Sequence, residues 1–323
     1  MDWSGQRVFV TGGAGFLGSN LSLALAARGA RVVALDGFLF GGGAHQKNLE
    51  GSDVELVRGD IRELDLRPLC EGASVIFNLA AQTSHMGGQN DPLVDIAVNA
   101  VAQVRLIQAA REAAPDAVVV HASTRQFYGR VLKLPVNESQ PVAPPDANGV
   151  SKFAGEQYWL LEHRVRGRPV VSLRLTNCYG PRLRIRDARQ AFLGIWIRSV
   201  LENKPFEVWG GEQLRDLTFV DDATDAFLRA AATPDCHGKI FNIGGAPPAS
   251  MRQIADLVVQ VAGPPAHYTV KEFPADRARI DIGSYHADDS AFRAATGWAP
   301  RVSLEDGIGR TIDWYRTRLA DYL

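Results

Sequence analysis

Three glycines near the N-terminus have the spacing of a phosphate-binding turn. Gly12, Gly15 and Gly18 lie in the segment 11–18, which reads TGGAGFLG, between a β-branched run and a stretch that is apolar at helical spacing. Because glycine has no side chain, the backbone N–H groups at the start of the following helix can approach a pyrophosphate closely. The pattern predicts a dinucleotide site that also includes Phe16 and Leu17. The alternative is that the glycines serve only a tight turn.

An acidic residue follows at the position that such a site requires. Asp36 ends the run after 31–35, roughly twenty residues beyond the glycines, where a carboxylate accepts hydrogen bonds from the ribose of adenosine. Its charge would repel a 2′-phosphate, and the segment 37–40 contains no arginine that would bind one. We therefore expect NAD rather than NADP as the cofactor.

Two later segments are placed to line the same cofactor. Asp60 and Ile61 follow the third apolar run, where the carboxylate could reach the adenine amino group or could simply cap a helix. The fourth run ends in mostly small residues, which let the backbone pass close to a cofactor. These residues are Leu79, Ala80 and Ala81.

Parallel strands are needed to bring these positions together. Apolar runs predict strands at 7–11, 31–35, 54–58, 74–79, 117–121 and 169–175, and helical spacing predicts helices at 16–26, 93–113, 148–164 and 192–201. This alternation predicts an α/β fold with a parallel sheet covered on both faces. We expect a nucleotide-binding domain at 1–176, with a return segment at about 217–245, and a smaller C-terminal α/β domain at 177–216 and 246–323.

Composition excludes several other classes of protein. The chain has 323 residues, of which 46% are hydrophobic, and its net charge of -1 lacks the broad positive field of a nucleic-acid-binding protein. No uninterrupted apolar run reaches the ~20 residues of a membrane helix, and the N-terminus lacks the pattern of a signal peptide. Three scattered cysteines suggest reduced thiols in a cytoplasmic protein without a metal site.

Taken together, the motifs resemble those of the extended short-chain dehydrogenase/reductase family, in particular its NAD-dependent nucleotide-sugar epimerases and dehydratases. The resemblance covers nearly the whole chain and rests on the segments 11–18, 36, 60–61, 78–81, 123–129, 149–152, 174–181 and 213–222. It implies a Rossmann-type, doubly wound parallel sheet that holds NAD, and a smaller domain that binds a nucleotide-diphosphate sugar. It also implies that Asn99, Ser123 and Lys152 contact the cofactor.

The resemblance breaks at one catalytic position. Enzymes of this family use a Ser or Thr, a Tyr and a Lys, and Thr124 and Lys152 occupy the first and last of these positions. The Tyr should precede the Lys by four residues, but this chain has Asn148 there. An amide cannot act as a general base, so another group takes the substrate proton or the chemistry is lost.

Four side chains are candidates for the missing base. They are His85, Lys152 with a pKa lowered by burial, Tyr128 and Tyr179. We favour His85, because the resemblance places the loop after the fourth strand near the sugar. The alternative is that His85 is an ordinary loop histidine.

The neighbours of Thr124 limit the reaction. By resemblance, dehydratases and decarboxylases have carboxylates next to this position, whereas this chain has Arg125 and Gln126. Of the family's reactions, epimerisation remains. In this reaction a sugar hydroxyl is oxidised transiently by NAD and then reduced again. A dehydratase, another NAD-dependent sugar-modifying enzyme, or a catalytically silent protein that binds NAD and a nucleotide sugar are the alternatives.

Several cations are available for an anionic substrate. The resemblance implies that Asn177, Arg215 and Arg279 hold the phosphates, and that His85, Thr124 and Arg125 lie near the sugar. Four arginines lie in the segment 182–189, including Arg186 and Arg189. Their guanidinium groups suit a diphosphate or a sugar carboxylate, which suggests a uronate as the sugar. The alternative is that these arginines are simply exposed to solvent.

The family's subunits pair through two helices, which correspond here to 93–113 and 148–164. Stripes of residues on these helices are compatible with a homodimer, or with packing on the sheet of one chain. The stripes are Ile96, Val104 and Ile107 on the first helix and Phe153, Gln157 and Leu161 on the second.

Overall fold

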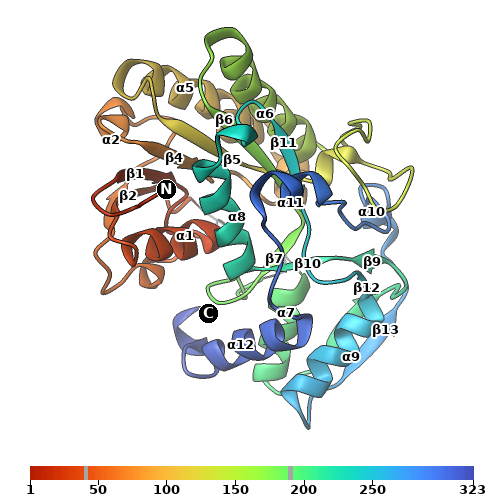
Figure 1. Cartoon of the computed structure of the whole chain (residues 1–323). Helices are drawn as coiled ribbons and strands as arrows, with labels where there is room; N and C mark the ends of the chain where they lie inside the picture. The colour runs from red at the N-terminus through yellow and green to blue at the C-terminus, as the bar shows by residue number, and fades with distance from the viewer. Residues whose placement is uncertain (40–42, 188–191) are drawn as a thin grey trace.

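A seven-stranded parallel sheet forms the larger part of the computed structural model, which describes residues 1–39, 43–187 and 192–323. The strand order is β11-β6-β5-β4-β1-β2-β3, and every neighbouring pair is parallel. The bounds are β1 Arg7–Thr11, β2 Arg31–Asp36, β3 Glu55–Arg58, β4 Val75–Asn78, β5 Val118–Thr124, β6 Val170–Leu175 and β11 Ile240–Ile243. The predicted fold class is confirmed (Figure 1).

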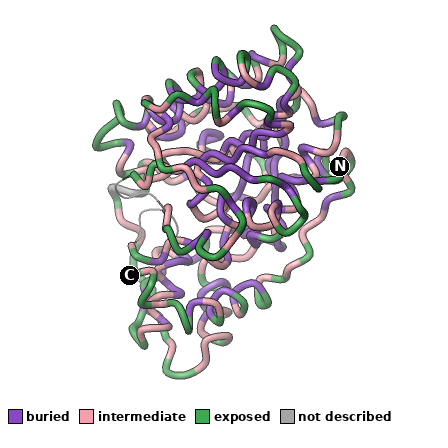
Figure 2. The backbone as a smooth tube through the Cα atoms, turned by 90° about the vertical axis from the view of Figure 1, so that its left-hand side faces the viewer, coloured by how far each residue is buried: buried purple, intermediate pink, exposed green. Residues whose placement is uncertain are grey.

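Helices cover both faces of this sheet because alternate strand residues point to opposite sides. Val8 and Val10 pack in one apolar cluster with α1 and α8, whereas Phe9 packs in another with α5 and α6. These helices and their shorter neighbours are α1 Phe16–Ala26, α2 Arg67–Cys70, α5 Ala102–Ala113, α6 Ala147–Arg166, α8 Val220–Ala232 and α11 Ser290–Thr296. Figure 2 shows that the centre of this region is buried.

The segment predicted as one helix at 93–113 contains an irregular turn. It consists of α4 Pro92–Ile96, a π-helical segment Ala97–Val101 and α5. Among the described residues, this is the one helix long and apolar enough to cross a membrane by length and composition, and 56% of its most apolar window is buried inside the protein, as in a core helix. Of the two alternatives for Ile107, packing on the sheet is the one observed, because this side chain is 3% exposed and packs with Leu106 and Ala110 against the sheet.

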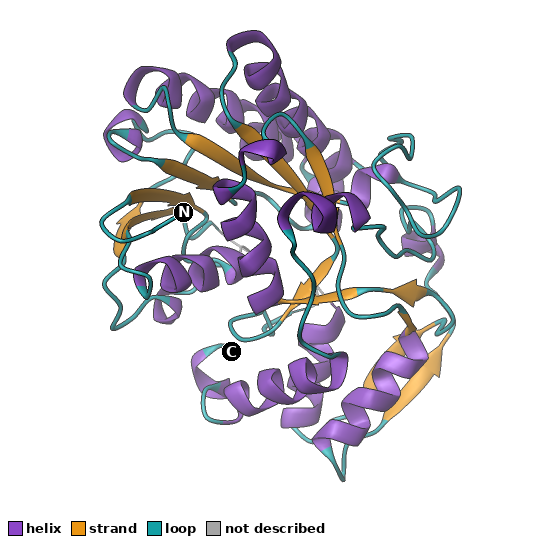
Figure 3. Cartoon of the chain, viewed as in Figure 1, coloured by secondary structure: helices purple, strands orange, loops and turns teal. Residues whose placement is uncertain are grey.

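A smaller body is built from short strand pairs and helices around its own apolar core (Figure 3). Its strand pairs are β7 Asn177–Tyr179 with β10 Leu217–Phe219, β9 Leu214–Arg215 with β12 Ala249–Ser250, and β8 Phe206–Trp209 with β13 Tyr268–Lys271. Its helices are α7 Phe192–Leu201, α9 Met251–Ala262, α10 Ala275–Ala278 and α12 Leu304–Arg316. Trp196, Ile254 and Ile308 bring three of these helices into one cluster.

Short helical segments complete the chain. They are the six-residue helix α3 His85–Asn90 and the 3-10 turns η1 Gln46–Asn48, η3 Gln126–Tyr128, η4 Pro234–Cys236 and η5 Leu319–Asp321. α3 and η3 follow the carboxyl ends of β4 and β5. In doubly wound sheets this edge is where ligands bind.

Candidate active site

The glycine turn leaves a bare backbone at the start of α1. Gly12 has φ +68°, and a Cβ atom added there would lie 2.9 Å from the backbone of Leu79 and Ala80. A Cβ at Gly18 would lie 2.1 Å from the carbonyl oxygen of Gly12. The close packing therefore requires glycine, and Gly15 caps the helix whose N-terminus faces the groove. These features fit the pyrophosphate of a dinucleotide.

Asp36 stands at the end of β2 on the same groove. Its carboxylate accepts backbone N–H groups from Ala14 at 3.1 Å and Phe38 at 3.0 Å, which fix its orientation. Burial raises the pKa of this carboxyl, and the backbone donors act in the opposite direction. The remaining lone pairs are available to the two hydroxyls of a ribose.

The groove encloses a cavity of about 330 Å³ that gathers most of the predicted cofactor residues. Asn99 is an exception, because it does not line this cavity. Its amide oxygen accepts from the Gln82 N–H at 2.9 Å and its amide nitrogen donates to Ser151 at 3.2 Å, so it supports the loop behind the cavity. The predicted residues that do line it are Gly12, Gly15, Phe16, Leu17, Gly18, Asp36, Asp60, Ile61, Leu79, Ala80, Ala81, Ser123 and Lys152.

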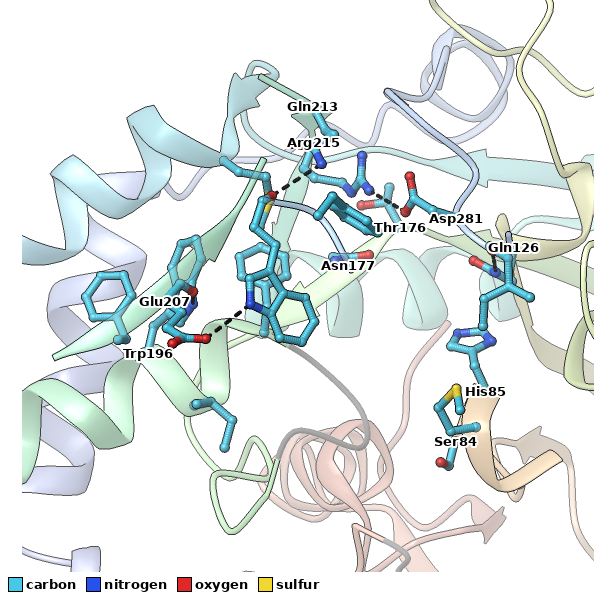
Figure 4. Close-up of a pocket in the computed structure, with 18 of the residues that line it drawn as sticks. Ser84, His85, Gln126, Thr176, Asn177, Trp196, Glu207, Gln213, Arg215 and Asp281 are labelled. Atoms are coloured by element: carbon cyan, nitrogen blue, oxygen red, sulfur yellow. Dashed lines mark hydrogen bonds and ion pairs between the residues drawn. The ribbon is translucent and has the colours of Figure 1, made fainter. Parts of the chain in front are cut away.

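A second cavity of about 690 Å³ lies between the sheet edge and the smaller body. His85 and Gln126 lie at one end and Trp196 at the other (Figure 4). Thr124 and Phe206 also line this cavity. The two cavities share a wall. The residues that line both are His85, Thr124, Leu175, Thr176 and Asn177.

At the position that a Tyr would occupy, Asn148 is tied to the protein. Its side-chain nitrogen donates to the Gln82 carbonyl oxygen at 2.9 Å and to the Asp95 carboxylate at 3.1 Å, and the residue is 1% exposed. Lys152, one helical turn later, is half-buried and lines the cofactor cavity. Burial lowers the pKa of its ammonium to about 8, while the carboxylates of Asp95 and Asp146 act the other way.

His85 is held by a residue that the sequence reasoning missed. Its Nδ1 lies 2.7 Å from Oδ2 of Asp146, whose side chain is fully buried. Asp146 is the N-cap of α6 and accepts the Gly149 N–H at 2.6 Å. An aspartate directly before the predicted helix is a recognisable N-cap signal. Its contact with His85 spans 61 residues of chain and is not encoded locally.

Two buried arginines reach the second cavity. Arg215 donates to the Gly283 carbonyl oxygen at 2.6 Å and lies 3.2 Å from the Asp281 carboxylate (Figure 4). Burial and the nearby Arg125 lower its pKa to about 10. Arg125 is 7% exposed, stacks on the Tyr285 ring and donates to Asn177, and its Nη1 has no hydrogen-bond partner among the residues described.

The other predicted substrate arginines are not brought to this cavity. Arg186 and Arg279 are exposed and line neither cavity, and Arg189 lies outside the described residues. Within the same segment, Arg182 donates to Asn20 at 3.0 Å and Arg184 pairs with Asp187. The described part of this run is thus used within the protein or faces solvent.

Comparison with known proteins agrees with this arrangement. Residues 8–244 match the model of the NAD dependent epimerase/dehydratase family. UDP-glucose 4-epimerase of Mycolicibacterium smegmatis is 34% identical over 317 residues, covering 97% of this chain and 99% of that protein. dTDP-glucose 4,6-dehydratase of Xanthomonas campestris pv. campestris is 31% identical, covering 95% of this chain and 92% of that protein.

Solved structures that resemble this chain are also epimerases. UDP-glucose 4-epimerase of Thermotoga maritima with UDP-glucose has a TM-score of 0.87 at 26% identity, covering 97% of this chain and 100% of that one. UDP-glucuronic acid 4-epimerase of Bacillus cereus, in complex with UDP-glucuronic acid and NAD, has a TM-score of 0.85 at 27% identity, covering 97% and 99%. With the glycine turn, Asp36 and Lys152 around one groove, this chain belongs to the NAD dependent epimerase/dehydratase family of enzymes.

Proposed function

We propose that the protein is an NAD-dependent epimerase, and thus an isomerase, that acts on a nucleotide-diphosphate sugar although Asn148 replaces the usual Tyr. The observation that carries the proposal is the shared wall of the two cavities at Thr124 and Asn177. A sugar seated in the larger cavity meets the end of the cofactor groove there. The relatives named as epimerases of UDP-sugars support the same reaction class.

The residues around the shared wall have separate tasks in this proposal. NAD, when bound, supplies a reversible acceptor for two electrons of a sugar carbinol. The Thr124 hydroxyl donates a hydrogen bond to the substrate oxygen, and Lys152 adds positive charge on the cofactor side. No carboxylate stands at 125–126, next to Thr124, so the elimination of water lacks its acid and base at that point.

We propose further that the sugar of the substrate is anionic. Arg125 lines the cavity and its buried Nη1 has no hydrogen-bond partner among the described residues, and Arg215, which lines the same cavity, lies near it. A diphosphate and a sugar carboxylate both match guanidinium donors. We assign Arg215 to the diphosphate and Arg125 to a uronate carboxylate. The complex of the Bacillus cereus enzyme with UDP-glucuronic acid is consistent with this choice.

The protein is further proposed to act as a cytoplasmic homodimer. Apolar side chains are exposed on α4, on the adjoining π-helical segment and on α6, which pack against one another. A helix pair that exposes such a surface suits a two-fold interface. The exposed residues are Leu93, Val94, Ile96, Val101, Val150, Tyr158, Leu161 and Val165. Sedimentation of the wild type and of Val165→Glu tests the interface, and a monomeric wild type would exclude it.

A catalytically silent binding protein is the competing function, which Asn148 favours. The test is to mix NAD-loaded protein with neutral and acidic UDP-, GDP-, CDP- and dTDP-sugars, to follow the absorbance of reduced nicotinamide, and to identify products by NMR. The proposal predicts a new epimer from at least one acidic sugar. Silence with sugars that demonstrably bind would favour the competing function.

A further inference from the structure

We propose that His85 and Asp146 form a dyad in which His85 Nε2 accepts the proton of the substrate hydroxyl and Asp146 positions the ring. The inference rests on the proposed function and identifies the group that replaces the Tyr. Histidine would be the catalytic residue and Asp146 a positioning residue.

The two oxygens of Asp146 have different tasks. Oδ1 accepts the Gly149 N–H at 2.6 Å and is fixed by the start of α6, while Oδ2 lies 2.7 Å from His85 Nδ1. Gln126 donates to Oδ2 at 3.4 Å. Burial raises the pKa of Asp146, but the contacts with His85 and Gly149 outweigh this effect and hold the pKa below its usual value. A charged carboxylate therefore faces Nδ1 at neutral pH.

This contact selects the tautomer of the ring. A carboxylate accepts hydrogen bonds, so the proton of neutral His85 resides on Nδ1 and Nε2 keeps its lone pair. Nε2 has no hydrogen-bond partner among the residues described, and the side chain is 37% exposed. When Nε2 gains a proton, the charge of Asp146 stabilises the imidazolium.

The ring is also at the correct place. His85 begins α3, where Ser84 accepts the Gly87 N–H at 3.1 Å, and it lines both cavities. Figure 4 shows it with Gln126 at one end of the larger cavity. Thr124, the last residue of β5, is another hydrogen-bonding side chain of the shared wall. A sugar hydroxyl at this wall is offered a donor by Thr124 and an acceptor by His85.

The competing bases are less well placed. Tyr128 and Tyr179 are buried and line neither cavity, and Tyr128 donates its hydroxyl proton to Asn242 at 2.8 Å. Lys152 lines the cofactor cavity but not the larger one. Both hydrogens of the Asn148 amide are taken by Gln82 and Asp95.

The proton and electron balance is simple. The O–H bond of the sugar breaks and an N–H bond forms at Nε2, while the hydrogen of the same carbon leaves with its electron pair to the NAD of the proposed function. On the return, the carbon regains that hydrogen on the opposite face and Nε2 returns its proton to the oxygen. His85 is thus neutral again after each turnover.

Asp146→Asn is the sharpest test. Asparagine caps a helix as well as aspartate does, so α6 retains its N-terminal bond to Gly149. Its amide NH₂ then faces Nδ1 and drives the ring proton to Nε2, where it blocks proton uptake. We expect kcat to fall by about 10²- to 10⁴-fold with KM nearly unchanged. The melting temperature should stay close to that of the wild type.

Ring NMR gives a reading that does not depend on turnover. Nitrogen-15 chemical shifts should report the Nδ1–H tautomer of neutral His85 in the wild type and the Nε2–H tautomer in Asp146→Asn. Asp91→Asn is the matched control, because Asp91 caps α4 by accepting the Val94 N–H at 3.2 Å and is exposed. It should leave kcat and the His85 signals unchanged.

His85→Gln completes the test, with the exposed His267→Gln as its control. The dyad predicts that His85→Gln binds NAD and the nucleotide sugar but no longer oxidises the sugar. An active wild type whose His85 and Asp146 variants keep its kcat would overturn the dyad and leave the proposed function intact. A wild type that binds the sugars yet converts none would overturn the proposed function and the base role together. An Nε2–H tautomer in the wild type overturns the dyad by itself.

Discussion

The Asn148 amide and the Asp95 carboxylate are joined by a hydrogen bond of 3.1 Å between Nδ2 and Oδ1. Asp95 is fully buried and its other oxygen accepts the Ser151 hydroxyl at 2.9 Å. The residue that replaces the family's Tyr is therefore part of a buried network that joins α6 to α4. The arrangement gives Asn148 a structural task, and because Asn148 also lines the cofactor cavity, its place in the catalytic site stays a prediction.

Removing the Asn148 amide should lower the free energy of unfolding and have a smaller effect on kcat. Asn148→Ala leaves Asp95 with one hydrogen bond fewer in a buried setting, which costs about 1–3 kcal/mol of the free energy of unfolding. Denaturant titration measures this loss, and Asn137→Ala at an exposed loop position is the control. A variant as stable as the wild type, or one that folds fully but is inactive, would contradict the structural role.

The charge of Arg125 should decide between acidic and neutral sugars. Arg125→Met removes a charge-assisted hydrogen bond worth about 1.5–3 kcal/mol, so kcat/KM for a uronate should fall about 10- to 100-fold more than for the neutral hexose. Arg125→Lys keeps the charge, so its kcat/KM for the uronate should lie between that of the wild type and that of Arg125→Met. Arg28→Met, an exposed change just beyond the C-terminal end of α1, is the control. Equal losses for both sugars would exclude a carboxylate site at Arg125.

The same pair of sugars tests the exposed arginine that was predicted to bind substrate. Arg186→Met should leave the ratio of kcat/KM values unchanged, because Arg186 lines neither cavity. Steady-state kinetics at one ionic strength measures the ratio. A selective loss on the acidic sugar would show that this residue reaches the substrate in solution.

The contribution of Lys152 to the free energy of unfolding of the cofactor-free protein should become more favourable as the pH rises. Its folded-state pKa is about 8, below the ordinary value of 10.5, so between these values the unfolded chain binds more protons than the folded one. The destabilisation, on the order of 3 kcal/mol at most, is fully present below pH 8 and is relieved towards pH 10.5.

Lys152→Met isolates this effect. Without NAD the variant should be more stable than the wild type at pH 7, and the difference in the free energy of unfolding should shrink as the pH rises above 8. Urea titrations of both proteins at several pH values give the difference. A difference that is constant or grows with pH would contradict the lowered pKa.

Gly18 should tolerate no side chain. Gly18→Ala places a Cβ atom 2.1 Å from the Gly12 carbonyl oxygen, so the turn must move and the affinity for NAD should fall about tenfold or more, equivalent to at least ~1.4 kcal/mol. Calorimetric titration with NAD measures this. Gly309→Ala in α12 meets only Val261 at 3.7 Å and should raise stability by up to about 1 kcal/mol. Unchanged NAD affinity in Gly18→Ala would contradict the proposed contact.

The sequence predicts the sheet and the cofactor groove well because their signals are local. Val8, Phe9 and Val10 indicate a buried strand, and Gly18 and Asp36 belong to a pattern of fixed spacing. The fold class follows from the alternation of such segments. The division into domains at 1–176, 177–216 and 246–323 stays a prediction, since a strand order does not define where one domain ends.

The site depends on contacts between distant segments, which local patterns do not reveal. Asp146 meets His85 across 61 residues, and Arg125 reaches Asn177 across 52. The stripe that contains Ile107 is compatible with a partner or with the sheet, because helical periodicity does not tell which of the two an apolar stripe faces, and only the structure shows that Ile107 faces the sheet. Asn99 was assigned to the cofactor, although its side chain bonds to the loop behind the cavity.

The π-helical segment Ala97–Val101 determines how α4 is rotated about the helix axis relative to α5. A π-turn accommodates one residue more than an α-helical turn, and each residue turns an α-helix by about 100°. The extra residue is taken up within 97–101, so Asp95 keeps the face that meets Asn148 and Ser151. If the same residues wound as a regular α-helix, Asp95 would turn by about 100° away from that face, and the start of α6, where Asp146 holds His85, would lose its contact with α4.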